Sequence, residues 1–171
     1  SVDRLVYLKT KNFLVYVQGQ KPIQAKRVLL ATGGHPSGRR LASSLGHKIV
    51  APVPSLFSFS LASFSLSMCS GLAVNNVNLK LITADNFYKE IGRVLITHRG
   101  LTGPAILRLS AFAARDLNKD KYQAKLIINW IDSDYDFVKK IFKEFRLYSL
   151  RKTLANSNPF KTLPKNLWVA I

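Results

Sequence analysis

Large apolar residues alternate with serines or other polar residues through the middle of this chain, and the alternation changes phase twice. The first alternating stretch covers residues 57–61, and its apolar phase flips in residues 64–68. A period of two predicts a half-buried β-strand, and a change of phase predicts a turn or a bulge. We therefore expect such an irregularity at 62–63 and another at 75–76, in a small antiparallel sheet or barrel of short strands.

A different pattern ends in the letters VLLATGG. Residues 28–31 are uniformly apolar, which is typical of a strand buried on both faces of a parallel sheet, and two glycines follow Thr32. Before it we expect half-buried strands with turns at 10–12 and 18–22, and after it a helix over 36–45.

Further along the chain, the pattern predicts a mixture of strands and helices. A strand over 93–97 leads through a glycine-bracketed loop to a helix that begins at Pro104 and continues to Leu117. A strand over 122–130 precedes a helix capped by Asp132 or Ser133, whose apolar face is formed by Val138, Ile141, Phe142 and Phe145. One more helix is expected over 163–170. The fold class is therefore α+β.

Charge and composition limit the function classes. The 171 residues carry 26 Lys and Arg against 9 Asp and Glu, a net charge of +17, so nucleic acid or another anionic partner has to be considered. No zinc finger or RNA-binding aromatic motif accompanies this charge. No apolar run is long enough to span a membrane, and the single cysteine, Cys69, fits an inert thiol in a reducing, cytoplasmic setting. Because both ends lack the usual signals of a chain terminus, we expect a part of a longer protein.

Few residues are arranged for catalysis. The histidines His35, His47 and His98 lack the spacing of a metal site, and no P-loop or dinucleotide glycine motif is present. Two glycine loops remain. The first is Ala31-Thr32-Gly33-Gly34, where a bare backbone could approach a phosphate or ribose, or could simply form a strand-to-helix turn.

The second loop runs Thr97-His98-Arg99-Gly100-Leu101-Thr102-Gly103-Pro104. The free N–H groups of the following helix, with the positive charge of His98 and Arg99, could hold an anion. For Thr102 and Pro104 an ordinary helix cap is the favoured interpretation.

The two loops together, with the intervening LGHKIVAPVPSLFSF, resemble the bacterial NAD(P)/FAD-dependent oxidoreductases of the aminoacetone-oxidase-like flavoprotein family. The resemblance covers most of residues 25–115, and the phrase THRGLTGPAIL is its most specific part. It implies that residues 1–55 are the C-terminal part of a Rossmann-like FAD-binding segment. Residues 56–171 would then be an inserted β-rich domain with helices.

The resemblance also implies a site. Ala31, Thr32, Gly33 and Gly34 would lie beside FAD, and the loop of Thr97, His98, Arg99, Gly100, Thr102 and Gly103 would face the flavin cleft or an anion. The segment after ATGG, HPSGRRLASSLGH, is shorter here than in many members. No metal is implied, and no catalytic residue can be named.

We therefore expect part of an FAD-dependent oxidoreductase that uses NAD(P)H on a substrate that the sequence does not name. The glycine-rich pyrophosphate loop of that family is missing, so we expect this chain to be inactive alone and to require the remainder of its own polypeptide as partner. The alternative is a basic, non-enzymatic module that binds nucleic acid or another anionic partner. A membrane is not expected as partner.

Overall fold

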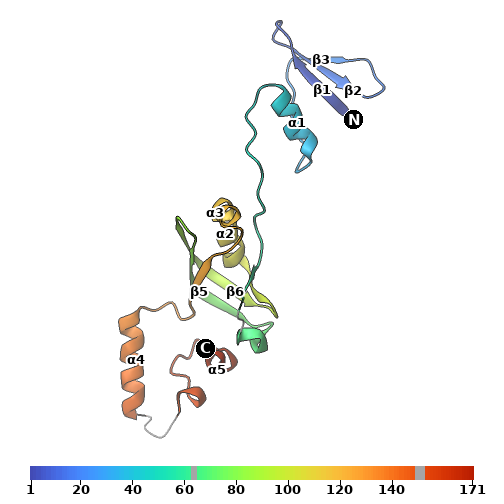
Figure 1. The fold of residues 1–171 in the computed structure, drawn as a ribbon. Helices are drawn as coiled ribbons and strands as arrows, with labels where there is room; N and C mark the ends of the chain where they lie inside the picture. Colours follow the sequence, from blue (N-terminus) through green and yellow to red (C-terminus); the bar gives the residue numbers. More distant parts are fainter. Residues whose placement is uncertain (63–64, 149–152) are drawn as a thin grey trace. The chain divides into compact units, whose positions relative to one another are not determined.

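The computed structural model describes residues 1–62, 65–148 and 153–171. The chain divides into two compact units, Ser1–Pro52 and Val53–Ile171 (Figure 1). Helices and antiparallel sheets are mixed along the chain, which confirms the expected α+β class.

The first unit contains a three-stranded antiparallel sheet in the order β1-β2-β3. Its strands are β1 (Val2–Tyr7), β2 (Phe13–Val17) and β3 (Ile23–Ala25). The first turn is closed between Leu8 and Asn12, and the second contains Gly19 with a φ of 73°. Both predicted turns are therefore confirmed.

The helix α1 (Pro36–Ser44) forms where the sequence predicts it and packs on β1. Leu41 of the helix and Leu5 of β1 are both buried, and they form the small core of this unit. The side chain of His35 caps the helix, because its Nδ1 accepts a hydrogen bond from the backbone N–H of Ser37 at 3.2 Å.

The buried strand predicted over residues 28–31 is wrong. These residues form no strand, and the side chain of Leu29 is 88% exposed. A strand needs a neighbour that pairs with its N–H and C=O groups, and none of the described strands pairs with this segment. A hollow of about 650 Å³ lies in the same unit, lined in part by Leu5, Val28, Leu30 and Leu45.

The second unit is built on a five-stranded antiparallel sheet in the order β4-β7-β6-β5-β8. Its strands are β4 (Phe59–Ser60), β5 (Ala73–Ile82), β6 (Phe87–Ile96), β7 (Gly100–Thr102) and β8 (Lys125–Asn129). The phase flip at 75–76 is a β-bulge within β5, since the pairing register shifts between Val74 and Val77 and Asn76 has a φ of 53°. This prediction is confirmed.

The first phase flip has a different outcome. Residues 65–68 do not continue as a strand, because a 3-10 helix, η1 (Ser65–Cys69), forms there and buries Leu66 and Cys69 in the core. The turn expected at 62–63 involves Ser63, which lies outside the described residues, as does Phe64. Serine alternation therefore predicted the wrong element here, because tertiary packing of two side chains outweighed the local pattern.

Helices cover one face of the larger sheet. The expected helix from Pro104 to Leu117 is divided at Ala113 into α2 (Pro104–Phe112) and α3 (Ala114–Lys119). The core contains Ile106 and Leu109 of α2 together with Leu79, Val94 and other apolar residues of the strands. The remaining helices are α4 (Tyr135–Tyr148), the 3-10 helix η2 (Leu154–Asn156) and α5 (Lys165–Ala170).

The residues predicted to cap α4 are also wrong. Asp134, rather than Asp132 or Ser133, provides the side-chain oxygen that accepts the N–H of Phe137, at 2.8 Å. The predicted apolar face of α4 is only half-buried. Within the described residues, no helix has the length and apolar content needed to cross a membrane.

A hydrogen-bonded carboxylate ties the β5–β6 hairpin to α3. Asp116 Oδ2 accepts hydrogen bonds from the Tyr88 hydroxyl and from Asn86 Nδ2, each at 2.7 Å. These bonds, first that of Tyr88 and then that of Asn86, hold the pKa of Asp116 below its usual range. The same contact raises the pKa of Tyr88.

We predict that Asp116→Asn destabilises the second unit at neutral pH more than at acidic pH. Because the folded pKa of Asp116 is lowered, its carboxylate contributes stability above the unfolded pKa of about 3.9, and this contribution is lost as the pH falls through the folded pKa. Both tryptophans, Trp130 and Trp168, lie in the second unit, so thermal melting followed by their fluorescence measures it selectively.

The matched control is Asp136→Asn in the exposed first turn of α4. The melting-temperature difference between wild type and Asp116→Asn should narrow as the pH is lowered, while the control stays close to wild type. A difference that is constant between neutral and acidic pH would contradict the account.

Candidate functional site

The predicted cofactor loop Ala31–Gly34 lies directly before α1 in the first unit. All four residues are exposed. The carbonyl oxygen of Thr32 accepts the N–H of His35 at 3.3 Å, and Arg39 Nη1 donates to the carbonyl oxygen of Gly34 at 3.2 Å. The loop is therefore held against the first turns of the helix by its own carbonyl groups.

The backbone of the two glycines is accessible. A β-carbon built on Gly33 or Gly34 would meet no atom within 4 Å, and Gly33 has a φ of 58°, where a side chain is strained. Thr32 packs on the helix instead, since a β-carbon at Gly38 would lie 2.0 Å from Thr32 Oγ1. The arrangement leaves one open peptide surface next to a helix N-terminus, which is what a close-lying cofactor needs.

The second predicted loop, Thr97–Gly103, is part of a hairpin in the second unit. Thr97 N–H donates to the carbonyl oxygen of Gly100 at 2.8 Å, and Thr97 Oγ1 accepts the N–H of Gly100 at 3.2 Å. These bonds close the turn between β6 and β7, so the loop contains a strand that the sequence pattern did not predict. His98 and Arg99 are exposed at the tip of the turn.

Close backbone contacts within the fold explain why two positions of this loop are glycines. A β-carbon on Gly100 would lie 2.0 Å from the carbonyl oxygen of Phe59, because β4 pairs closely with β7 there. Gly103 has a φ of 105°, and a β-carbon would lie 2.9 Å from the carbonyl oxygen of Arg93. Both glycines are thus required for strand packing, whatever else the loop does.

Thr102 does not cap α2 as predicted. The N-cap is Gly103, which has no side chain, and Thr102 Oγ1 accepts a hydrogen bond from Ser58 Oγ at 2.7 Å. Pro104 occupies the first turn of the helix, as predicted. The favoured interpretation was therefore right for Pro104 and wrong for Thr102, whose hydroxyl joins β7 to the segment before β4.

The structure brings each predicted set together locally. Ala31–Gly34 form one loop at α1, and Thr97–Gly103 form one hairpin between β6 and α2. The two sets belong to different compact units of the chain. No group of three or more His, Cys, Asp or Glu residues that could hold a metal ion occurs among residues 1–62, 65–148 and 153–171.

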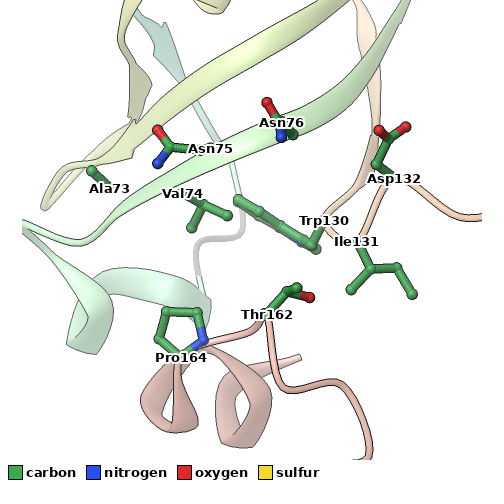
Figure 2. Close-up of a pocket in the computed structure, with 9 residues that line it drawn as sticks. All are labelled: Ala73, Val74, Asn75, Asn76, Trp130, Ile131, Asp132, Thr162 and Pro164. Carbon is green, nitrogen blue, oxygen red and sulfur yellow. The ribbon is translucent and has the colours of Figure 1, made fainter.

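A hollow at the β5 bulge is a feature that the residue pattern does not predict. It measures about 480 Å³ and is lined by Asn75, Asn76, Trp130, Asp132, Thr162 and neighbouring residues. In Figure 2 the amides of Asn75 and Asn76 project from the strand on the side away from Thr162 and Pro164. Because the polar groups do not converge on one point, this hollow lacks the arrangement of a specific ligand site.

Sequence reasoning missed a second feature, an exposed aromatic side chain between lysines on the strand hairpin. Phe87 is 59% exposed, and the amino groups of Lys80 and Lys89 lie 4.7 and 5.7 Å from the centre of its ring. The alternation of residues along β5 and β6 could have placed these three side chains on one face. It could not have shown that this face is the uncovered one.

A known protein family matches the second unit of this chain. Residues 53–171 match the model of a family described as HI0933-like protein barrel and H2TH domain. The matched residues include the five-stranded sheet and the described helices α2, α3, α4 and α5.

Curated relatives match over part of their own length. A ribosomal RNA dihydrouridine synthase of Haemophilus influenzae is 30% identical over 122 residues, which is 66% of this chain and 29% of that protein. A 3-dehydro-bile acid delta(4,6)-reductase of Clostridium scindens is 27% identical over 122 residues, 67% of this chain and 30% of that protein. A ribosomal RNA dihydrouridine synthase of Escherichia coli is 31% identical over 101 residues, 53% of this chain and 24% of that protein. The chain thus spans less than a third of the length of these relatives.

The close approach at Gly100 generates a stability prediction. Gly100→Ala should destabilise the second unit by about 3 kcal/mol, because β4 must move away from β7 to admit the methyl group. For a unit of this size, the melting temperature measured by tryptophan fluorescence should fall by roughly 10 °C.

The matched control is Gly34→Ala, whose added methyl group meets no atom within 4 Å; because Gly34 lies in the first unit, its melting is followed by far-UV circular dichroism. Its melting should remain that of the wild type. Equal melting temperatures for Gly100→Ala and wild type would show that the β4–β7 contact does not require a glycine.

Proposed function

The chain belongs to the HI0933-like family, and from this membership we propose that it is part of an FAD-dependent oxidoreductase. The family is related to FAD-dependent oxidoreductases, and the matched relatives include a named reductase and two named dihydrouridine synthases. The observation that carries the proposal is the family match over the entire second unit. FAD, when bound, supplies the redox chemistry, and the protein supplies binding and orientation.

The residues of the first unit fit one wall of a flavin site. Gly33 and Gly34 present an open backbone, so a planar or phosphorylated group can approach their peptide atoms closely. Arg39 holds the carbonyl oxygen of Gly34 toward the helix, which keeps the loop in this conformation. We propose that Ala31 to Gly34 contact FAD, and that the Thr97–Gly103 hairpin, including His98 and Arg99, lies at the cleft.

The exposed apolar surface of the first unit supports a need for further polypeptide. Leu29 is 88% exposed, and Leu30 lines an open hollow with Leu5 and Leu45. Burying such side chains is favourable, and an unpaired apolar segment would pair readily with another strand. We propose that the remainder of its own polypeptide covers this surface, and that the chain alone is inactive.

RNA is the substrate class that the charge favours. A net charge of +17 attracts a polyanion, and two matched relatives are named for ribosomal RNA. We propose that the whole protein acts on RNA in a reducing cytoplasm, with NAD(P)H as the electron donor. This joins the two functions that the sequence suggested separately, because a basic surface is what an oxidoreductase acting on RNA requires.

A visible absorption spectrum tests the flavin proposal. The longer protein that contains this chain should purify with flavin absorbance near one FAD per molecule, while residues 1–171 alone should carry little. Gly34→Val in the longer protein should reduce the flavin content at least about twofold by filling the open backbone surface, without lowering thermal stability.

The control is Gln24→Val, an exposed position on β3 of the same unit, which should retain full flavin content. If the longer protein purifies without flavin, the oxidoreductase proposal is rejected and the non-enzymatic basic module remains. If Gly34→Val retains the flavin content of the wild type, the proposal that this loop contacts FAD is rejected.

A further inference from the structure

One face of the second unit's sheet is not covered by the described helices of the same unit. Strand register places Phe87, Ile82 and Lys125 in one row across β6, β5 and β8, and Lys89, Lys80 and Ile127 in the next. We call these six residues the open face. The alternate residues of the same strands, such as Leu79, Leu81 and Val94, point the other way and are buried in the core.

Large apolar side chains of the open face are exposed. Phe87 is 59% exposed and Ile127 is 44% exposed. Ile91, which follows Lys89 on the same side of β6, is 55% exposed. An exposed aromatic side chain on an antiparallel sheet is a platform on which a planar ring can stack. This face is therefore different from an ordinary polar, solvated sheet surface.

Positive charge surrounds the aromatic ring. Lys80 and Lys89 are directly opposite each other in the strand register, and both amino groups lie within 6 Å of the Phe87 ring centre. Like charges in opposite positions destabilise a sheet. None of the six residues of the open face, all of which the structure describes, is acidic, so an external anion would relieve this repulsion.

The acidic residues near these strands have other partners. Glu90 of β6 points toward α2, where it accepts a hydrogen bond from Arg108 Nη2 at 2.9 Å. Asp85, at the hairpin turn, pairs with Lys119 of α3. Asp132 accepts a hydrogen bond from Asn78, one row beyond the lysines and away from Phe87. Lys80, Lys89 and Lys125 are in none of the ion pairs of the described residues.

We propose that the open face binds single-stranded RNA, with a base stacked on Phe87 and phosphates beside Lys80, Lys89 and Lys125. Single-stranded nucleic acid is recognised by this combination of an aromatic platform with flanking cations. The inference deepens the proposed function, on which its choice of RNA rests. It assigns substrate binding to the uncovered face of the sheet, and not to either glycine loop.

Fluorescence anisotropy of a fluorescein-labelled oligouridylate, titrated with the 171-residue chain over a series of KCl concentrations, tests the proposal. Phe87→Leu should weaken binding by about tenfold through loss of stacking. Lys80→Gln combined with Lys89→Gln should reduce the slope of log affinity against log salt concentration by roughly 1.4, since two phosphate contacts are lost. Unchanged thermal melting of each variant would show that it is folded.

Matched controls lie on α4. Phe137 is 50% exposed, so Phe137→Leu removes a comparable aromatic ring, and Lys139→Gln combined with Lys143→Gln removes the same charge. These variants should bind within about twofold of wild type. Equal losses in the α4 and open-face variants would overturn the proposal, because net charge alone would then explain binding.

Two further results would overturn it. One is open-face variants that bind RNA as well as wild type. The other is absence of RNA binding, with binding instead to vesicles of phosphatidylcholine and phosphatidylglycerol. Flavin in the longer protein is measured independently, so its presence without RNA binding would reject the open face alone. If the longer protein contains no flavin but binds RNA in a way that depends on Phe87, the oxidoreductase proposal is rejected and the proposal of an RNA-binding open face is kept.

Discussion

A β-strand must place its backbone N–H and C=O groups against a neighbouring strand, and the two units of this chain meet that requirement differently. In the second unit, five strands pair in one antiparallel sheet with a buried core on one face. In the first unit, the apolar segment 28–31 has no described partner, and Leu29 is almost fully exposed. The open glycine loop follows directly after this unpaired segment, so under the proposed function the same further polypeptide would cover both.

The same requirement explains why the two glycine loops have different roles. Gly100 and Gly103 are needed because strand backbones approach them to within 3 Å of where a β-carbon would stand. Gly33 and Gly34 have no such neighbour. The φ of 58° accounts for a glycine at position 33, whereas no contact or backbone angle in the described part of the fold requires a glycine at position 34. We infer that a ligand or further polypeptide uses the space at the first loop, whereas the second loop already serves the sheet.

Local patterns predicted the elements that depend on local forces. The bulge at Asn76 and the helix after Pro36 follow from periodicity and from residues with strong backbone preferences. Long-range contacts decided the rest. A glycine is needed at position 100 because the backbone of Phe59, 41 positions earlier, approaches it closely. The hydroxyl of Thr102 accepts a hydrogen bond from Ser58 and does not cap a helix.

For the same reason the sequence could not show which sheet face is open. Strand alternation places Lys80 and Phe87 on one side, but only the position of α2 determines that the other side is buried. Asp132, Ser133 and Asp134 are adjacent and could each cap α4. Only the course of the chain after β8 determines that Asp134 is the cap. Sequence therefore reached the fold class and the existence of two glycine loops, while the exposed surfaces required the structure.

Hydrogen exchange of the amides in residues 28–34 tests the central claim most directly, namely that this segment is completed by polypeptide and flavin outside the chain. We expect fast exchange in the 171-residue chain and strong protection in the longer, flavin-containing protein, because strand pairing and the bound cofactor would remove these amides from solvent. Equally fast exchange in both proteins would contradict the account. Protection already present in the isolated chain would contradict it as well.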